Sequence, residues 1–127
     1  MIANEPVYVN GDGETSRDFC YIDNTVQANI LAATTSNPDA VDQVYNVAVG
    51  DRTTLNDLFE AIRSGLVEKF PHLADFKATY RDFRAGDVRH SLADISKAER
   101  LLGYEPSHRI GEGMNVALDW YVQDITG

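Results

Sequence analysis

The sequence contains a single cysteine and no long apolar run. Because Cys20 has no partner within the chain, an internal disulfide is excluded, and we expect the protein in the reducing cytoplasm. No apolar stretch approaches the roughly 18 residues of a membrane-spanning helix, and no signal-like segment opens the sequence. We therefore expect no membrane partner.

Basic residues are also scarce. The 127 residues include 11 Lys and Arg against 20 Asp and Glu, which gives a formal net charge of -9. This charge disfavours nucleic acid and anionic membranes as partners, because both repel an acidic protein. The three histidines lie far apart and have no cysteine neighbours, so we expect no metal site. A bound anion would need arginines placed close to it.

The length and the 43% hydrophobic content are typical of one soluble domain, spanning residues 1–127. Apolar residues at helical spacing predict four helices, capped or begun at Asp23, at Thr53 or Thr54, at Ser96 and at Ile110. Gly103 is expected to end the third of these helices. Short strands are expected at 7–9, 18–22, 44–49 and 77–80, with a tight turn at 11–13 joining the first two. This mixture predicts an α/β fold, or an α+β-like one.

Two short segments combine arginine with glycine, Gly-Asp-Gly-Glu-Thr-Ser-Arg-Asp-Phe at 11–19 and Arg-Ala-Gly-Asp-Val-Arg-His-Ser at 84–91. The arginine fork matches two phosphate oxygens, and glycine lets backbone approach a ligand. Three of the eight arginines fall within residues 81–89. The segments indicate an anion site. From spacing alone, a solvated loop with surface ion pairs fits the residues equally well. Arg89 and His90 could contact a phosphate, but their presence is explained equally well by the polar character of a surface loop.

In this order, the segments resemble the C-terminal, substrate-binding part of the extended short-chain dehydrogenases that act on nucleotide sugars. The strongest similarity is to UDP-N-acetylglucosamine and UDP-N-acetylglucosaminuronate 4-epimerases. Matching segments are residues 7–13, 17–23, 44–48, 84–87 and 93–98. The resemblance implies the C-terminal portion of a Rossmann enzyme that uses NAD and takes a UDP-sugar as substrate.

Two features of that family are missing from the chain. Ser16 stands where the NAD-binding turn needs its third glycine, and no Tyr is followed four residues later by Lys. The resemblance therefore implies that the N-terminal NAD-binding half is absent, and that this chain binds no NAD and does not catalyse alone. We expect surfaces that would meet the missing half, including the edge of the 44–49 strand, to be exposed and to favour self-association.

The resemblance also assigns roles to residues that bind the diphosphate and the ribose. Arg17 and Arg84 correspond to arginines that contact the UDP diphosphate, and Asp87 to a carboxylate that accepts hydrogen bonds from the ribose hydroxyls. Two structural alternatives stay open at this point. One is an ion pair of Arg17 with Asp18 or Asp23, and the other is a turn at 84–87 bracketed by an ion pair.

Three further positions correspond to the base and sugar ends of the ligand. Tyr8 and Asn10 match positions beside the uracil, although strand alternation alone makes Tyr8 a packing residue. Ser91 matches the position that borders the sugar C2 substituent, where a small side chain leaves room for an N-acetyl group. An ordinary loop serine is the structural alternative for Ser91.

Other functions share these motifs. A fragment of a dTDP-glucose 4,6-dehydratase or a UDP-glucuronate decarboxylase would carry the same arginines, and the neighbourhood of Ser91 is the main discriminator. A stand-alone module that binds a nucleotide or a protein belongs to a different class. A glycine-rich NAD turn and a Tyr-x-x-x-Lys pair upstream in the reading frame would separate these possibilities.

We expect the isolated chain to show no epimerase activity and no tight NAD binding, because it holds neither the phosphate-binding turn nor the catalytic pair. Titration calorimetry with NAD measures this directly. Binding at micromolar affinity would contradict the expectation.

Overall fold

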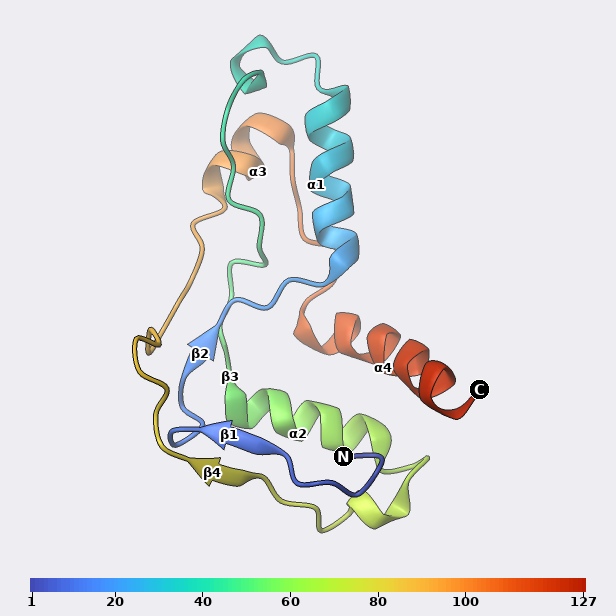
Figure 1. The fold of residues 1–127 in the computed structure, drawn as a ribbon. Coiled ribbons are helices and arrows are strands. Elements are labelled where there is room, and N and C mark those ends of the chain that lie inside the picture. The colour runs from blue at the N-terminus through green and yellow to red at the C-terminus, as the bar shows by residue number, and fades with distance from the viewer.

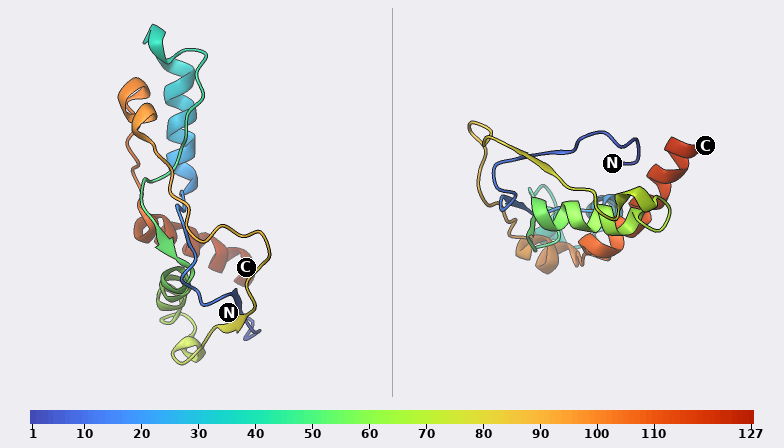
Figure 2. Two further views of the ribbon diagram at one scale, coloured as in Figure 1. Left: turned by 90° about the vertical axis from the view of Figure 1, so that its left-hand side faces the viewer. Right: turned by 90° about the horizontal axis from the view of Figure 1, so that it is seen from below.

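Two pairs of helices lie at opposite ends of an elongated molecule (Figure 1). The computed structural model describes residues 1–127, apart from the side chain of residue 126. Helices α1 (Ile22–Thr34) and α3 (Ser96–Leu102) pack together at one end, and α2 (Leu55–Leu66) packs on α4 (Ile110–Thr126) at the other. Both chain termini lie at the end formed by α2 and α4 (Figure 2).

Short strands connect the two ends. Strand β1 (Tyr8–Asn10) pairs in parallel with β4 (Thr79–Arg81), and β2 (Ser16–Arg17) pairs antiparallel with β3 (Thr53–Thr54). Four helices with short strands confirm the predicted α/β class. The turn at 11–13 lies between two strands, as predicted, but those strands belong to different two-stranded sheets and do not pair with each other.

Each end has its own apolar core. One cluster lies between α1, α3 and the chain around Ala48, and the other lies between α2 and α4. The buried members of the first are Ala28, Ala40, Ala48, Ile95, Ala98, Leu102 and Tyr104. Those of the second are Leu66, Leu73 and Leu118. Two of these residues lie in short 3-10 helices: Ala40 in Pro38–Ala40 and Leu73 in Pro71–Leu73.

Local capping signals predicted two helix ends correctly. The Thr54 side chain accepts a hydrogen bond from the Asp57 N–H at the start of α2. Gly103 ends α3 with a left-handed backbone, φ 67°. The predicted cap of α1 is wrong, because Tyr21 occupies the N-cap position and Asp23 lies inside the first turn. The predicted strand at 18–22 is also wrong, since β2 ends at Arg17 and Ile22 already begins α1.

The segment 44–49 was expected to be a strand, and it is not one. Its side chains alternate, because Tyr45 and Val47 pack on the first core while Val44 is 86% exposed. No neighbouring strand among the described residues pairs with it. The N–H groups of Val49 and Gly50 donate instead to the Asp18 carboxylate, at 2.9 and 3.0 Å. The strand edge expected at 44–49 is therefore not formed.

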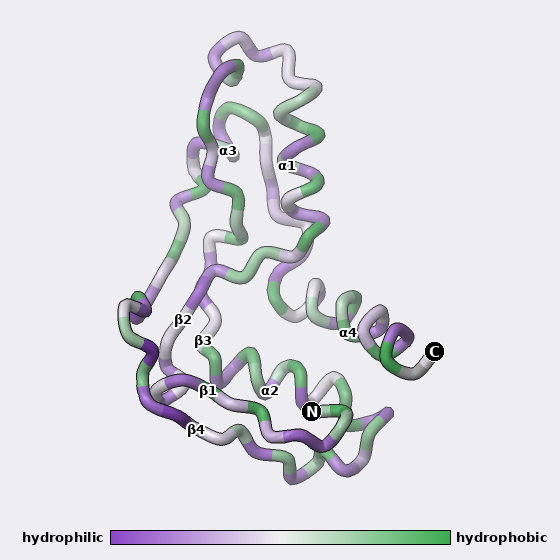
Figure 3. The backbone as a smooth tube through the Cα atoms, in the orientation of Figure 1, coloured by the Kyte–Doolittle hydropathy of each residue, from purple (hydrophilic) through white to green (hydrophobic). Residues whose placement is uncertain are grey.

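Exposed apolar side chains are nevertheless numerous. Hydrophobic and hydrophilic positions alternate along α1 (Figure 3), and Ile22, Val26 and Ile30 of this helix are 61%, 46% and 58% exposed. Self-association through such surfaces remains a proposal. None of the helices described is long and apolar enough to cross a membrane.

Candidate functional site

The two arginine-containing segments meet at Ser16, in strand β2. The Ser16 N–H donates to the carbonyl of Arg89 at 3.0 Å, and the Ser91 N–H donates to the carbonyl of Ser16 at 3.2 Å. A 2.9 Å hydrogen bond between Ser16 Oγ and His90 Nδ1 adds a side-chain contact. These bonds place the loop 82–91 beside residues 11–17, more than 60 residues away in the sequence.

Arg17 follows Ser16 and forms an ion pair with the second segment. Its Nη2 lies 2.6 Å from Asp87 Oδ1, and its Nη1 donates to the carbonyl of Ser16 at 2.8 Å. The structural alternative that paired Arg17 with Asp18 is wrong, because the Asp18 carboxylate accepts backbone N–H groups instead. Arg17 Nη1 is thus held by a backbone carbonyl, while Nη2 contacts the Asp87 carboxylate at the surface.

Arg84 and Asp87 are the first and last residues of a turn. The Asp87 N–H donates to the Arg84 carbonyl at 3.2 Å, and Gly86 has a φ of +79° that favours glycine. The alternative in which these two side chains pair is wrong, since Asp87 pairs with Arg17. Arg84 is exposed and has no ion pair among the described residues, so its guanidinium is available to an external anion.

Arg89 and Asp12 form a second ion pair across the two segments. The two guanidinium nitrogens of Arg89 donate to the two carboxylate oxygens of Asp12, at 2.8 and 2.7 Å. These hydrogen bonds lower the pKa of Asp12 to about 2 and raise the pKa of Arg89. Arg89 therefore anchors the loop to the glycine turn. The sequence motifs left the role of Arg89 open and assigned none to Asp12, although the two motifs hold an arginine and an acid that could pair.

Tyr8 and Asn10 lie on strand β1, and their side chains are exposed. The guanidinium carbon of Arg81 lies 3.2 Å from the centre of the Tyr8 ring. No hydrogen bond within the described part of the chain joins either residue to Arg17 or Arg84. Ser91 is exposed and is joined to the arginine cluster through its backbone bond to Ser16.

The turn at 11–13 does not fit the pyrophosphate of NAD. A dinucleotide site needs the turn to open a helix, whereas this turn leads into β2. The Asn56 side chain covers Gly13 and bonds the Asp12 carbonyl at 3.2 Å and Tyr80 Oη at 2.8 Å. The space that an NAD phosphate would need is therefore occupied by protein.

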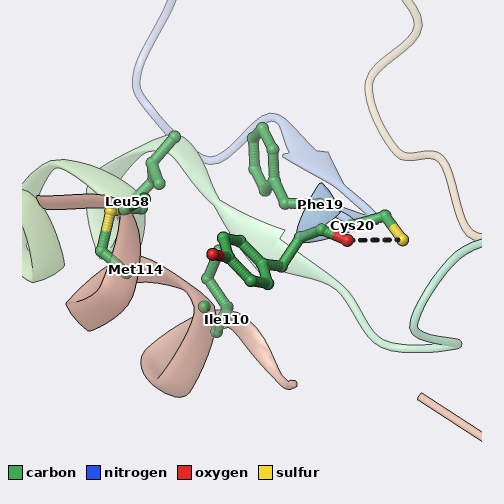
Figure 4. A pocket seen from close by; sticks show the side chains of 8 residues that line it. Phe19, Cys20, Leu58, Ile110 and Met114 are labelled. Atoms are coloured by element: carbon green, nitrogen blue, oxygen red, sulfur yellow. Dashed lines mark hydrogen bonds between the residues drawn. The ribbon is translucent and has the colours of Figure 1, made fainter. Parts of the chain in front are cut away.

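An apolar pocket of about 160 Å³ lies between α2, α4 and the segment 19–21 (Figure 4). Phe19, Cys20, Leu58, Ile110 and Met114 are among its lining residues. None of the six predicted ligand residues lines it, and it contains no charged side chain, so it is not the anion site. Among the described residues, no cluster of His, Cys, Asp and Glu could hold a metal ion.

The family model described as GDP-mannose 4,6 dehydratase matches residues 1–116. The chain belongs to this family. The chain spans 35% of the length of two curated relatives that it matches at 31% and 30% identity. It therefore corresponds to a portion of a nucleotide-sugar epimerase or dehydratase.

Solved structures of this family share the fold. A UDP-glucose 4-epimerase of Thermotoga maritima, with UDP-glucose, is 34% identical with a TM-score of 0.83, over 98% of this chain and 37% of that one. A UDP-N-acetylglucosamine 4-epimerase of Methanobrevibacter ruminantium, in complex with UDP-N-acetylmuramic acid, is 35% identical with a TM-score of 0.82, over 97% and 36%. A UDP-glucuronic acid 4-epimerase of Bacillus cereus, with UDP-glucuronic acid and NAD, is 27% identical with a TM-score of 0.74, over 96% and 37%.

The two glycine turns give a matched stability test. Gly13 and Gly86 share a φ of +79°, but a Cβ at Gly13 would overlap the Asn56 amide while one at Gly86 meets nothing. We expect Gly86→Ala to cost about 1–2 kcal/mol of unfolding free energy, the backbone strain alone. Gly13→Ala should cost a further ~1–3 kcal/mol, because the Asn56 hydrogen bonds must break.

Urea unfolding of the two variants measures this difference. Equal destabilisation by both substitutions would show that Asn56 does not hold the glycine turn in place.

Proposed function

We propose that this chain is the UDP-binding portion of an NAD-dependent UDP-N-acetylhexosamine 4-epimerase. The observation that carries the proposal is the meeting of Arg17 with the turn Arg84–Asp87, from segments about 70 residues apart. A chain with a net charge of -9 repels anions at long range. Arg17 pairs with Asp87, and Arg84 begins the turn that ends at Asp87, so these two arginines from distant segments support a dedicated anion site.

The diphosphate of a nucleotide sugar suits these side chains. Each arginine offers parallel N–H donors to a pair of phosphate oxygens. Asp87, which only accepts hydrogen bonds when ionised, suits the ribose hydroxyls. Tyr8 and Asn10, on the strand that leads into the glycine turn, are proposed to border the uracil. In this proposal the chain anchors UDP by remote binding energy and takes no part in bond making.

Specificity for an N-acetylated sugar rests on Ser91. Its small exposed side chain follows the loop that carries Asp87, and its backbone is held by Ser16. Overall similarity cannot separate the substrates, because identities to the UDP-glucose and UDP-N-acetylglucosamine enzymes are 34% and 35%. The size of residue 91 therefore decides this part of the proposal.

A sugar-nucleotide 4,6-dehydratase is the second candidate. The matching family model carries that description, and the diphosphate contacts would be the same. The two candidates differ in the chemistry of the NAD-binding half and in the sugar pocket, so the UDP-binding test below applies to both.

UDP should bind the isolated chain weakly and in a salt-dependent way. We expect a dissociation constant of about 1 mM or higher, roughly -4 kcal/mol, because other parts of the relatives supply the remaining pocket walls. Arg84→Ala should weaken this binding severalfold, since it removes the unpaired guanidinium. NMR titration with UDP gives both values.

Arg100→Ala is the matched control, because Arg100 is an exposed arginine on α3 at the other end of the molecule. If Arg100→Ala weakened UDP binding as much as Arg84→Ala, the binding would be general charge attraction and the proposed site would fall.

Ser91→Tyr tests the sugar assignment in the full-length enzyme that the proposal implies. A bulky ring at this position should lower kcat/KM for UDP-N-acetylhexosamines while sparing plain UDP-hexoses. Steady-state kinetics on both sugar pairs measure the ratio. An equal loss on both classes would remove the specificity assignment and leave the diphosphate assignment standing.

A further inference from the structure

The Asp87 carboxylate contacts the Arg17 guanidinium at the place where an anionic ligand would bind. Its Oδ1 lies 2.6 Å from Arg17 Nη2, where a phosphate oxygen of the proposed ligand would bind. We propose that Asp87 is an exchangeable counterion: the diphosphate displaces its carboxylate from Arg17, and the released carboxylate then accepts the ribose hydroxyls. This inference rests on the proposed function, and it adds an order of events and a coupling between two parts of the ligand.

The geometry of Arg17 allows such an exchange. Its Nη1 donates to the Ser16 carbonyl at 2.8 Å and lies 3.5 Å from the Arg89 carbonyl, so backbone groups hold the guanidinium in place. Only Nη2 faces the carboxylate. The Arg17 and Asp87 side chains are 27% and 42% exposed. An ion pair this accessible to water is weak and exchanges at small cost.

Charge balance requires the carboxylate to leave. The diphosphate of a nucleotide sugar carries two negative charges, which Arg17 and Arg84 would neutralise together. If Asp87 stayed paired with Arg17, a phosphate oxygen bound to Arg17 Nη2 would lie next to the Asp87 carboxylate, and the two negative charges would repel each other. Once released, the Asp87 carboxylate is free to accept hydrogen bonds from the ribose hydroxyls.

The neighbouring ion pair is built differently. Arg89 Nη1 and Nη2 donate to the two carboxylate oxygens of Asp12, so this pair is held by two hydrogen bonds. Asp87 contributes one oxygen, and its backbone is fixed by the turn to Arg84. The exchange therefore needs only a side-chain rotation of Asp87, while the Arg89–Asp12 pair keeps the loop in place.

Asp87→Asn separates this role from simple ligand binding. Inorganic pyrophosphate has no ribose, so it should bind the variant about two- to fivefold more tightly than the wild-type chain, the range set by the strength of an exposed ion pair. UDP should gain less, because the variant also loses the acceptor for the ribose hydroxyls. The advantage of UDP over 2′,3′-dideoxy-UDP should shrink in the variant. NMR titrations of the 127-residue chain give all these affinities.

Asp82→Asn is the matched control, since Asp82 is an exposed acid of the same loop with no ion pair among the described residues. It should change pyrophosphate affinity less than Asp87→Asn does. In a chain that already carries Arg17→Gln, adding Asp87→Asn should no longer tighten pyrophosphate binding, because the arginine that the carboxylate blocks is gone.

Unchanged or weaker pyrophosphate binding by Asp87→Asn would overturn the exchange, even if Arg84→Ala still weakened UDP binding and so upheld the proposed function. An equal gain from Asp82→Asn would also overturn it, as a general charge effect. If the wild-type chain bound neither UDP nor pyrophosphate, the proposed function and the exchange would both fall.

Discussion

Strand β2 is two residues long, yet hydrogen bonds on both of its edges determine where the site residues lie. On one edge Ser16 and Arg17 pair with Thr54 and Thr53 of β3. On the other edge the backbone of Ser16 bonds to Arg89 and Ser91. Ser16 is 5% exposed, so these backbone groups have no water to replace their partners, and breaking the pairing would leave them unsatisfied. The loop 82–91 is consequently held against Arg17, although its own side chains are exposed.

Two polar side chains, Asp18 (half-buried) and Asn24 (buried), then link segments that are distant in the sequence. The Asp18 carboxylate accepts the N–H groups of Val49 and Gly50, at 2.9 and 3.0 Å, and so joins β2 to the chain that packs on the first core. Asn24 is completely buried at the start of α1 and bonds the backbone of Ser107 and His108, just before α4. Because each core is small, these polar links carry much of the placement of one end relative to the other.

The sequence predicted what depends on near neighbours in the chain. The Thr54 cap and the Gly103 end of α3 follow from local backbone chemistry, and the four helices follow from apolar spacing. Sheet pairing depends on distant partners, and there the prediction failed. The alternation at 44–49 arises from packing on one side, which sequence periodicity cannot distinguish from a strand. The same limit applies to the site: the motifs indicated Arg17, Arg84 and Asp87, but only the fold could show which acid faces which arginine.

Under the proposed function, the pairing of acids with arginines would let an acidic protein bind an anion selectively. Asp12 accepts from two N–H groups of Arg89 and Asp87 accepts from one N–H group of Arg17, whereas Arg84 has no carboxylate partner among the described residues. A small anion that contacts Arg84 alone would leave the Arg17–Asp87 pair in place and gain nothing from Arg17. A ligand that brings a second phosphate group for Arg17 and hydroxyl donors for Asp87 satisfies all three side chains at once. In the proposed function, the ion pair between Arg17 and Asp87 would therefore favour a sugar-linked diphosphate over free phosphate by the small free energy of an exposed pair, because that ligand gives both members of the pair new partners.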